Sequence, residues 1–150
     1  MSTDTGTQDL KEFIRATLVE PPGKLSKELI KLCEGLIAIE PESKSVRMLK
    51  TKLTEQQQVA VLCLGYWILS FLMDSPSLSE VPRDTLVKQT GLEPNTISAY
   101  ASTLKQMRIL DNGATRGTYR IVLAKAPEFV RAIRGRISDT VDKEDHRNGS

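Results

Sequence analysis

The side chains of this sequence best suited to contact another molecule form a polar series within residues 94–107. The series combines small amide and hydroxyl groups with one aromatic ring and one cation, and its members are Asn95, Thr96, Ser98, Ala99, Tyr100, Ser102, Thr103 and Lys105. Groups of this kind donate to and accept from the base edges and phosphate oxygens of nucleic acid. The chemistry that they indicate is recognition through hydrogen bonds.

Positive charge collects around the same series. The whole chain has a net charge of only +2, but residues 83–136 hold ten Lys and Arg against four Asp and Glu, a balance of +6. The preceding residues 53–82 hold three acids and no Lys or Arg. Such a one-sided distribution is typical of a surface that contacts phosphates. The candidate contacts outside the polar series are Arg83, Lys88, Arg116, Thr118 and Arg120.

The sequence lacks the residue patterns that catalysis and metal binding need. His146 is the only histidine, and the sequence has no nucleophile–base pair, paired carboxylates or nucleotide-binding motif. Cys33 and Cys63 have no CxxC spacing, so we expect no metal site, no cofactor and no enzyme. We expect two buried thiols in a reducing compartment. A redox-sensing pair is the alternative, and it requires a low thiol pKa.

Two helices separated by a glycine turn are predicted to position the polar series. The first spans residues 83–90, Gly91 can adopt the left-handed conformation that ends a helix, and Pro94 suits the first turn of the second helix at 94–107. The second helix has one apolar stripe opposite the polar series. That stripe consists of Ile97, Ala101, Leu104 and Met107.

A β-hairpin is predicted directly after the second helix, because β-branched, apolar and aromatic residues flank a glycine-rich segment around Arg116. The sequence of residues 54–123 resembles the winged helix-turn-helix superfamily, and within it the MarR/ArsR-type regulators. The resemblance depends on this hairpin and on the run Lys-Gln-Thr-Gly-Leu-Glu-Pro-Asn-Thr-Ile-Ser at 88–98. The resemblance implies a mainly α fold with a small β-hairpin wing, here with an N-terminal helical extension and a C-terminal helix.

The same resemblance implies sequence-specific binding of double-stranded DNA by a dimeric transcriptional regulator. The helix at 94–107 would enter the major groove, with Asn95 placed to bond adenine and with Thr96 and Ser98 near phosphates. The wing at 111–120 would contact the backbone or the minor groove through its two arginines. A two-fold dimer would contact half-sites about 34 Å apart.

Two departures from the family pattern leave a second function open. Ala99 and Tyr100 stand where such helices often carry Arg or His, and Arg108 stands where Gly commonly ends the helix. The outward face therefore has no cation before Lys105, and affinity for DNA depends on the wing and on flanking basic residues. The alternative is a winged-helix adaptor that binds a protein partner in a transcription, replication or partition complex.

The longest predicted helix begins at Thr54 and opens the winged domain, residues 54–126. Thr54 and Gln57 are spaced as a capping box, and residues 56–73 carry no charge. Only residues 59–73 are mainly apolar, which is short of the roughly 20 needed to span a bilayer, so we expect a core helix and no membrane partner.

Polar tails are predicted at both ends of the chain, and a helical extension is predicted to follow the first of them. Residues 1–8 and 142–150 are expected as disordered tails and residues 9–53 as a helical extension. The helices expected in this extension begin at Asp9, at about residue 24 (ending near 39) and at about residue 43.

Three segments could form a homodimer interface: the N-terminal helices, the 54–73 helix and a final helix at 127–141. The final helix carries one apolar stripe, which either closes a dimer or packs on the chain's own core. Residues 78–81 are predicted to pair as a short strand beside the wing. The first nine residues lack an apolar segment, so a cytoplasmic protein, nucleoid-associated if prokaryotic, is expected.

Overall fold

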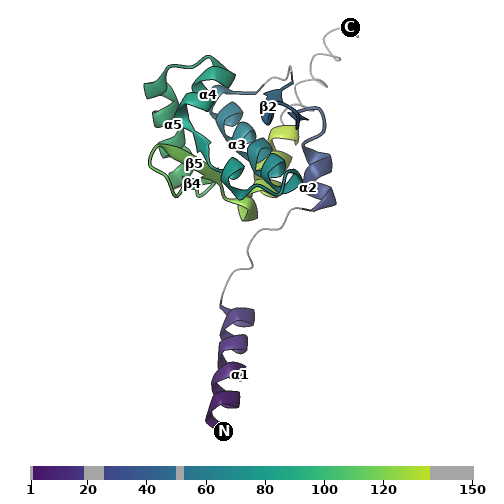
Figure 1. Cartoon of the computed structure of the whole chain (residues 1–150), viewed down its shortest axis with the longest axis vertical. Helices are drawn as coiled ribbons and strands as arrows, with labels where there is room; N and C mark the ends of the chain where they lie inside the picture. Colours follow the sequence, from purple (N-terminus) through teal and green to yellow (C-terminus); the bar gives the residue numbers. More distant parts are fainter. Residues whose placement is uncertain (1, 19–25, 50–52, 136–150) are drawn as a thin grey trace, which may run out of the picture.

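The computed structural model describes residues 2–18, 26–49 and 53–135. Over these residues the protein is mainly helical, with one two-stranded and one three-stranded antiparallel sheet (Figure 1). The elements in chain order are α1 (Ser2–Thr17), α2 (Lys27–Leu32), β1 (Ile37–Glu40), β2 (Ser45–Met48), α3 (Glu55–Leu72), the 3-10 helix η1 (Pro76–Ser79), β3 (Val81–Pro82), α4 (Arg83–Thr90), α5 (Pro94–Gln106), β4 (Leu110–Asn112), β5 (Thr118–Ile121) and the 3-10 helix η2 (Leu123–Lys125). A further helix covers residues 126–135.

α3 is the central element of the fold, as predicted. The capping box is present, because Thr54 Oγ1 accepts from Gln57 N at 3.2 Å and Gln57 Oε1 accepts from Thr54 N at 2.9 Å. Residues 59–66 are all buried, since β1, β2, α4, α5 and β5 all pack against this helix. Within the described ranges, no helix is long and apolar enough to cross a membrane.

α4 and α5 form the predicted pair of helices around a glycine turn. Gly91 ends α4 in the left-handed region, with φ 75°, and Pro94 is the first residue of α5. The shared apolar interface is fully buried and consists of Leu86, Ile97, Ala101 and Leu104. Met107, which was predicted to continue this stripe, is 51% exposed, because α5 ends at Gln106 and Met107 already caps it.

A three-stranded sheet follows α5 and has the order β3-β5-β4. The predicted hairpin is its β4–β5 pair, in which Leu110 lies opposite Ile121 and Asn112 lies opposite Tyr119. The strand predicted at 78–81 is shorter, since only Val81 and Pro82 pair with β5 and residues 76–79 form a 3-10 helix.

The segment between α1 and α3 corrects the prediction of an all-helical extension. α2 is capped by Ser26 and lasts only six residues, and Gly35 then turns the chain at φ 83°. Residues predicted as helix at 37–39 and 45–48 form the β1–β2 hairpin, with Ile39 opposite Val46. The β-branched side chains favour strands once the hairpin can pack on α3, and this long-range packing overrides the local helical periodicity.

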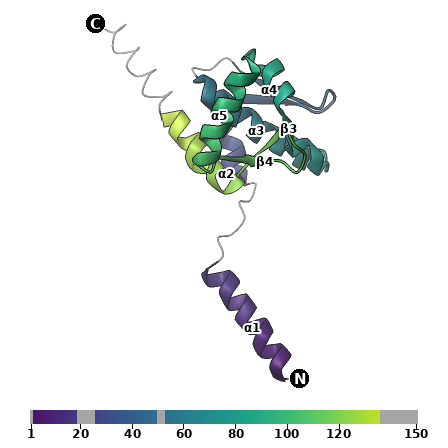
Figure 2. The same cartoon turned by 90° about the vertical axis from the view of Figure 1, so that its left-hand side faces the viewer.

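α1 also differs from its predicted bounds. It begins at Ser2 rather than at Asp9, so residues 2–8, expected within a disordered tail, are helical. Composition favoured a tail here because Ser, Thr and Gly are poor helix formers. In both views α1 stands apart from the remaining elements (Figures 1 and 2).

The helix at residues 126–135 packs on the chain's own core, which was one of the two outcomes left open. Val130 and Ile133 are buried, and Arg134 Nε donates to the Leu32 carbonyl at 2.6 Å. A cation at the carboxyl end of α2 satisfies carbonyls that have no partner within the helix. The predicted continuation to residue 141 and the tail at 142–150 lie outside the described residues.

Candidate nucleic-acid interface

The turn between α4 and α5 is held by its own hydrogen bonds. Gly91 N donates to the Val87 carbonyl at 2.8 Å. Thr90 Oγ1 donates to the Leu86 carbonyl at 2.7 Å and accepts from Leu92 N at 3.1 Å, so one hydroxyl closes α4 and orients the turn. The orientation of α5 relative to α4 is therefore fixed by the sequence Thr-Gly-Leu.

The outward face of α5 is polar and open to solvent. Asn95, Ala99, Ser102 and Thr103 are exposed, and Thr96 and Ser98 are partly buried beside them. Sequence reasoning missed Gln106, which is exposed and continues the line of 95, 99 and 102. Its spacing of four residues from Ser102 was the signal that could have found it. This face offers amide and hydroxyl groups and carries no charge.

Arg83 joins three parts of the candidate interface. Its Nη1 donates to Ser98 Oγ of α5 at 3.2 Å, and its backbone N donates to the Gly117 carbonyl at 3.1 Å. The guanidinium is exposed beside the first turn of α5. The first residue of α4 thus ties α5 to the tip of the hairpin.

The tip of the β4–β5 hairpin is compact. Gly113 N donates to the Thr118 carbonyl at 2.9 Å, and a Cβ at Gly113 would lie 2.1 Å from Thr118 Oγ1, so a side chain at this position would displace the Thr118 hydroxyl. Thr118 Oγ1 donates to the Thr115 carbonyl at 2.6 Å. Arg116 is exposed at the tip. The loop therefore presents one cation on a well-bonded turn, while the Thr118 hydroxyl is used within it.

A cleft of about 600 Å³ separates this loop from the start of α4. Arg83 and Arg116 both line it, together with Asp84. Two guanidinium groups at one cleft suit an anionic group such as a phosphate. The sequence carried no signal for this cleft, because it depends on how the loop folds back onto α4.

Two residues of the polar series turn away from the outward face. Tyr100 OH donates to Glu55 Oε2 on α3 at 3.0 Å, and this hydrogen bond to a carboxylate raises the pKa of Tyr100. Lys105 Nζ donates to Asn112 Oδ1 at 3.2 Å and lies 5.8 Å from the centre of the Tyr119 ring. The structure thus places these two side chains at the edges of α5, against α3 and against the hairpin.

The remaining candidate cations lie on α4 and β5. Lys88 is exposed in the last turn of α4, and Arg120 is exposed on β5, in register with Asp111. Carboxylates also occur nearby, since Glu93 occupies the N-cap of α5 and Glu80 accepts a hydrogen bond from Ala114 N in the hairpin loop. Arg83 and Arg116 line the same cleft, whereas Arg120 lies opposite Asp111.

α5 ends in a Schellman motif at an unusual residue. Ile109 N donates to the Leu104 carbonyl at 2.9 Å and Arg108 N donates to the Lys105 carbonyl at 3.0 Å. Arg108 has φ 62°, a conformation that favours glycine. The departure noted in the sequence thus leaves the helix end intact and adds an exposed cation beside it.

The two cysteines are buried free thiols, as expected. Burial raises the pKa of the Cys63 thiol to about 12 and that of Cys33 to about 11, with Arg134 acting weakly in the opposite direction. Raised thiol pKa values disfavour the reactive thiolate. Within the part of the chain that the structure describes, no group of three His, Cys, Asp or Glu side chains could hold a metal ion.

Comparisons with known proteins found no matching family model, no matching curated protein and no matching solved structure.

Proposed function

We propose that the protein is a winged helix-turn-helix protein that binds double-stranded DNA in a sequence-specific manner and regulates transcription. The observation that carries this proposal is the exposed polar face of α5, together with Arg83 at the start of α4 and Arg116 at the hairpin tip, which line one cleft. An α-helix fits the major groove, where exposed amides can bond base edges. Cations on one side of that helix then contact the phosphates.

The roles within this surface follow from exposure and bonding. Asn95 is exposed in the first turn of α5, where its amide can bond adenine N6 and N7 together. Arg83 and Arg116 would hold a phosphate in the cleft between them, and Arg120 would contact the backbone farther along the hairpin. Ser102 and Gln106 extend the base-contacting line toward the end of α5.

The test is a salt titration of binding to random and selected duplex DNA. A DNA-binding protein loses affinity with a log–log slope near −0.9 for each phosphate contact, so we expect a slope of several units and a tighter complex with a selected sequence. No binding to either duplex at low salt would contradict the proposal.

One observation favours a second function, that of a winged-helix adaptor for a protein partner. The outward face of α5 holds no cation, and Glu93 at its N-cap disfavours an approaching phosphate. An adaptor of this kind would show no steep salt dependence with DNA. The same titration therefore separates the two functions.

A further inference from the structure

α1 is an amphipathic helix with nothing packed on its apolar face. Leu10, Phe13, Ile14 and Leu18 stand at positions i, i+3, i+4 and i+8, on one side of the helix and of the residue that follows it, and are 59%, 66%, 41% and 77% exposed. α1 has 16 residues, only slightly more than the length below which isolated helices are marginal in water, and its Ser, Thr and Gly are poor helix formers. The helix therefore needs an apolar surface on which to pack.

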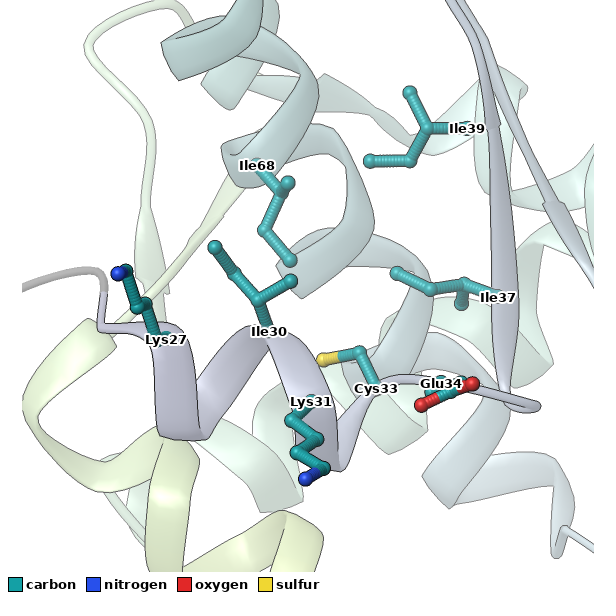
Figure 3. A pocket seen from close by; sticks show the side chains of 8 residues that line it. All are labelled: Lys27, Ile30, Lys31, Cys33, Glu34, Ile37, Ile39 and Ile68. Carbon is teal, nitrogen blue, oxygen red and sulfur yellow. The ribbon is translucent and has the colours of Figure 1, made fainter.

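The body of the protein offers such a surface on its N-terminal side. A groove of about 520 Å³ lies between α2, β1 and α3, and isoleucines from all three elements point into it (Figure 3). Ile30 comes from α2, Ile37 and Ile39 from β1, and Ile68 from α3. Ile30 is 47% exposed, so the groove is an open apolar trough.

We propose that the α1 apolar face of one copy occupies this groove in a second copy, and that the exchange is reciprocal, giving a homodimer. In the single chain the apolar residues of α1 are exposed, and α1 stands apart from α2, which borders the groove (Figures 1 and 2). A two-fold exchange covers both surfaces in both copies and forms a closed assembly. This inference does not rest on DNA binding.

Charged residues lie beside the apolar residues on both surfaces. Lys27 and Lys31 lie one turn apart on α2, and Glu34 lines the groove beyond them. On α1, Asp9 borders one edge of the apolar stripe, one turn before Phe13, and Lys11 borders the other edge, one turn before Ile14, while Glu12 lies on the opposite side of the helix. A docked α1 can therefore turn Asp9 toward the two lysines of α2. The proposed dimer pairs Asp9 of one copy with Lys31 of the other.

The size of the contact suits a stable dimer. Eight apolar side chains per dimer, each covering on the order of 100 Å² together with a matching area of groove, come to roughly the 1,600 Å² of a standard interface. The two contacts also reinforce each other, because the second forms within an assembly already held by the first.

Sedimentation equilibrium of the full chain over a wide concentration range tests the proposal. The unmodified chain should be dimeric, and Phe13→Glu and Ile30→Glu should each weaken the dimer at least tenfold. Both residues are substantially exposed, so the body should stay folded, which circular dichroism checks. Phe71→Glu, at an exposed apolar residue outside the groove, and Glu12→Lys, on the polar face of α1, are matched controls that should leave the dimer intact.

Mixing and charge reversal identify the occupant of the groove. Phe13→Glu keeps an intact groove and Ile30→Glu keeps an intact α1, so an equimolar mixture should form heterodimers more readily than either variant forms homodimers. Lys31→Glu should weaken the dimer, and adding Asp9→Lys should restore it.

Two results would overturn the exchange. One is a monomeric unmodified chain. The other is a dimer that persists in Phe13→Glu and Ile30→Glu. If the unmodified chain is monomeric and its α1 amides exchange slowly only while Ile30 is intact, α1 docks in its own groove and the second copy is excluded.

Discussion

Tyr100 donates its hydroxyl hydrogen to the carboxylate of Glu55, which joins the middle of α5 to the first residue of α3 at a distance of 3.0 Å. The two residues are 45 positions apart. The Tyr100 side chain, which was expected to contact the bases, therefore forms a hydrogen bond within the protein.

The first prediction concerns this pair. The protonated phenol donates to Glu55 and the phenolate would face its negative charge, so the pKa of Tyr100 is raised above its ordinary value of 10.0. We expect Glu55→Gln to lower the phenol pKa toward 10.0, followed by the ultraviolet absorbance of the phenolate. Tyr100→Phe serves as the reference, because it removes this phenol and leaves the other two tyrosines in place. An unchanged titration in Glu55→Gln would contradict the hydrogen bond.

The second prediction concerns base contact by α5. Asn95→Ala should relax the preference at one base-pair position of a selected duplex, at a cost of about 1–3 kcal/mol for the preferred base. Binding-site selection with each variant measures this. Tyr100→Phe is the matched control, since its hydroxyl is held by Glu55, and its selected sequence should not change. A selected sequence that is identical for Asn95→Ala would exclude the amide from the bases.

The third prediction concerns the hairpin tip. Arg116→Ala should weaken binding to all duplexes alike and reduce the magnitude of the salt slope by about 1, because one phosphate contact is lost. Arg47→Ala, on the β1–β2 hairpin, is the control and should leave the slope unchanged. An unaltered slope in Arg116→Ala would remove the hairpin tip from the phosphate-contacting surface.

The fourth prediction concerns the inner face of α5. Leu104 is fully buried, so Leu104→Ala should lower the free energy of unfolding by about 2–5 kcal/mol through lost contacts and a cavity. Urea unfolding measures the change. Met107→Ala, at a residue 51% exposed, should cost about 1 kcal/mol or less. Equal effects at the two positions would contradict the assignment of inner and outer faces.

The fifth prediction concerns the contact between the β1–β2 hairpin and α3. A Cβ at Gly65 would lie 2.5 Å from Val46 Cγ1, so Gly65→Ala should destabilise the fold by about 1–3 kcal/mol. Gly135→Ala meets no neighbouring atom within 4 Å and should be neutral. Removing the opposing methyl groups with Val46→Ala should make the added Gly65→Ala change less costly. If the two changes are simply additive, the hairpin does not pack at Gly65.

Local signals were sufficient to predict the central part of the fold. The Thr54–Gln57 capping box, the left-handed Gly91 and the burial of Leu104 all depend on residues within a few positions of one another. The pattern of α4, turn, α5 and hairpin followed from these signals. The outward exposure of Asn95 and Ser102 followed from the same helical period.

The missed features depend on contacts between distant residues. Residues 24–39 have an apolar stripe of helical period, which predicted one long helix. The strand that follows Gly35 forms instead because Ile37 and Val46 pack against α3 at Gly65, where there is no side chain. The direction of Tyr100 depends in the same way on Glu55. A helical period shows which side of α5 is buried. It does not show which residue of another element forms a hydrogen bond with a side chain at the edge of that side.

Arg83 connects the hairpin tip to α5 mechanically. Its backbone N donates to the Gly117 carbonyl in the hairpin tip, and its guanidinium donates to Ser98 of α5. A displacement of the hairpin would therefore be passed to α5 through Arg83, as well as through the Lys105–Asn112 hydrogen bond and the short connection from α5 to β4. These contacts restrain the distance between α5 and the hairpin tip from both sides of the helix.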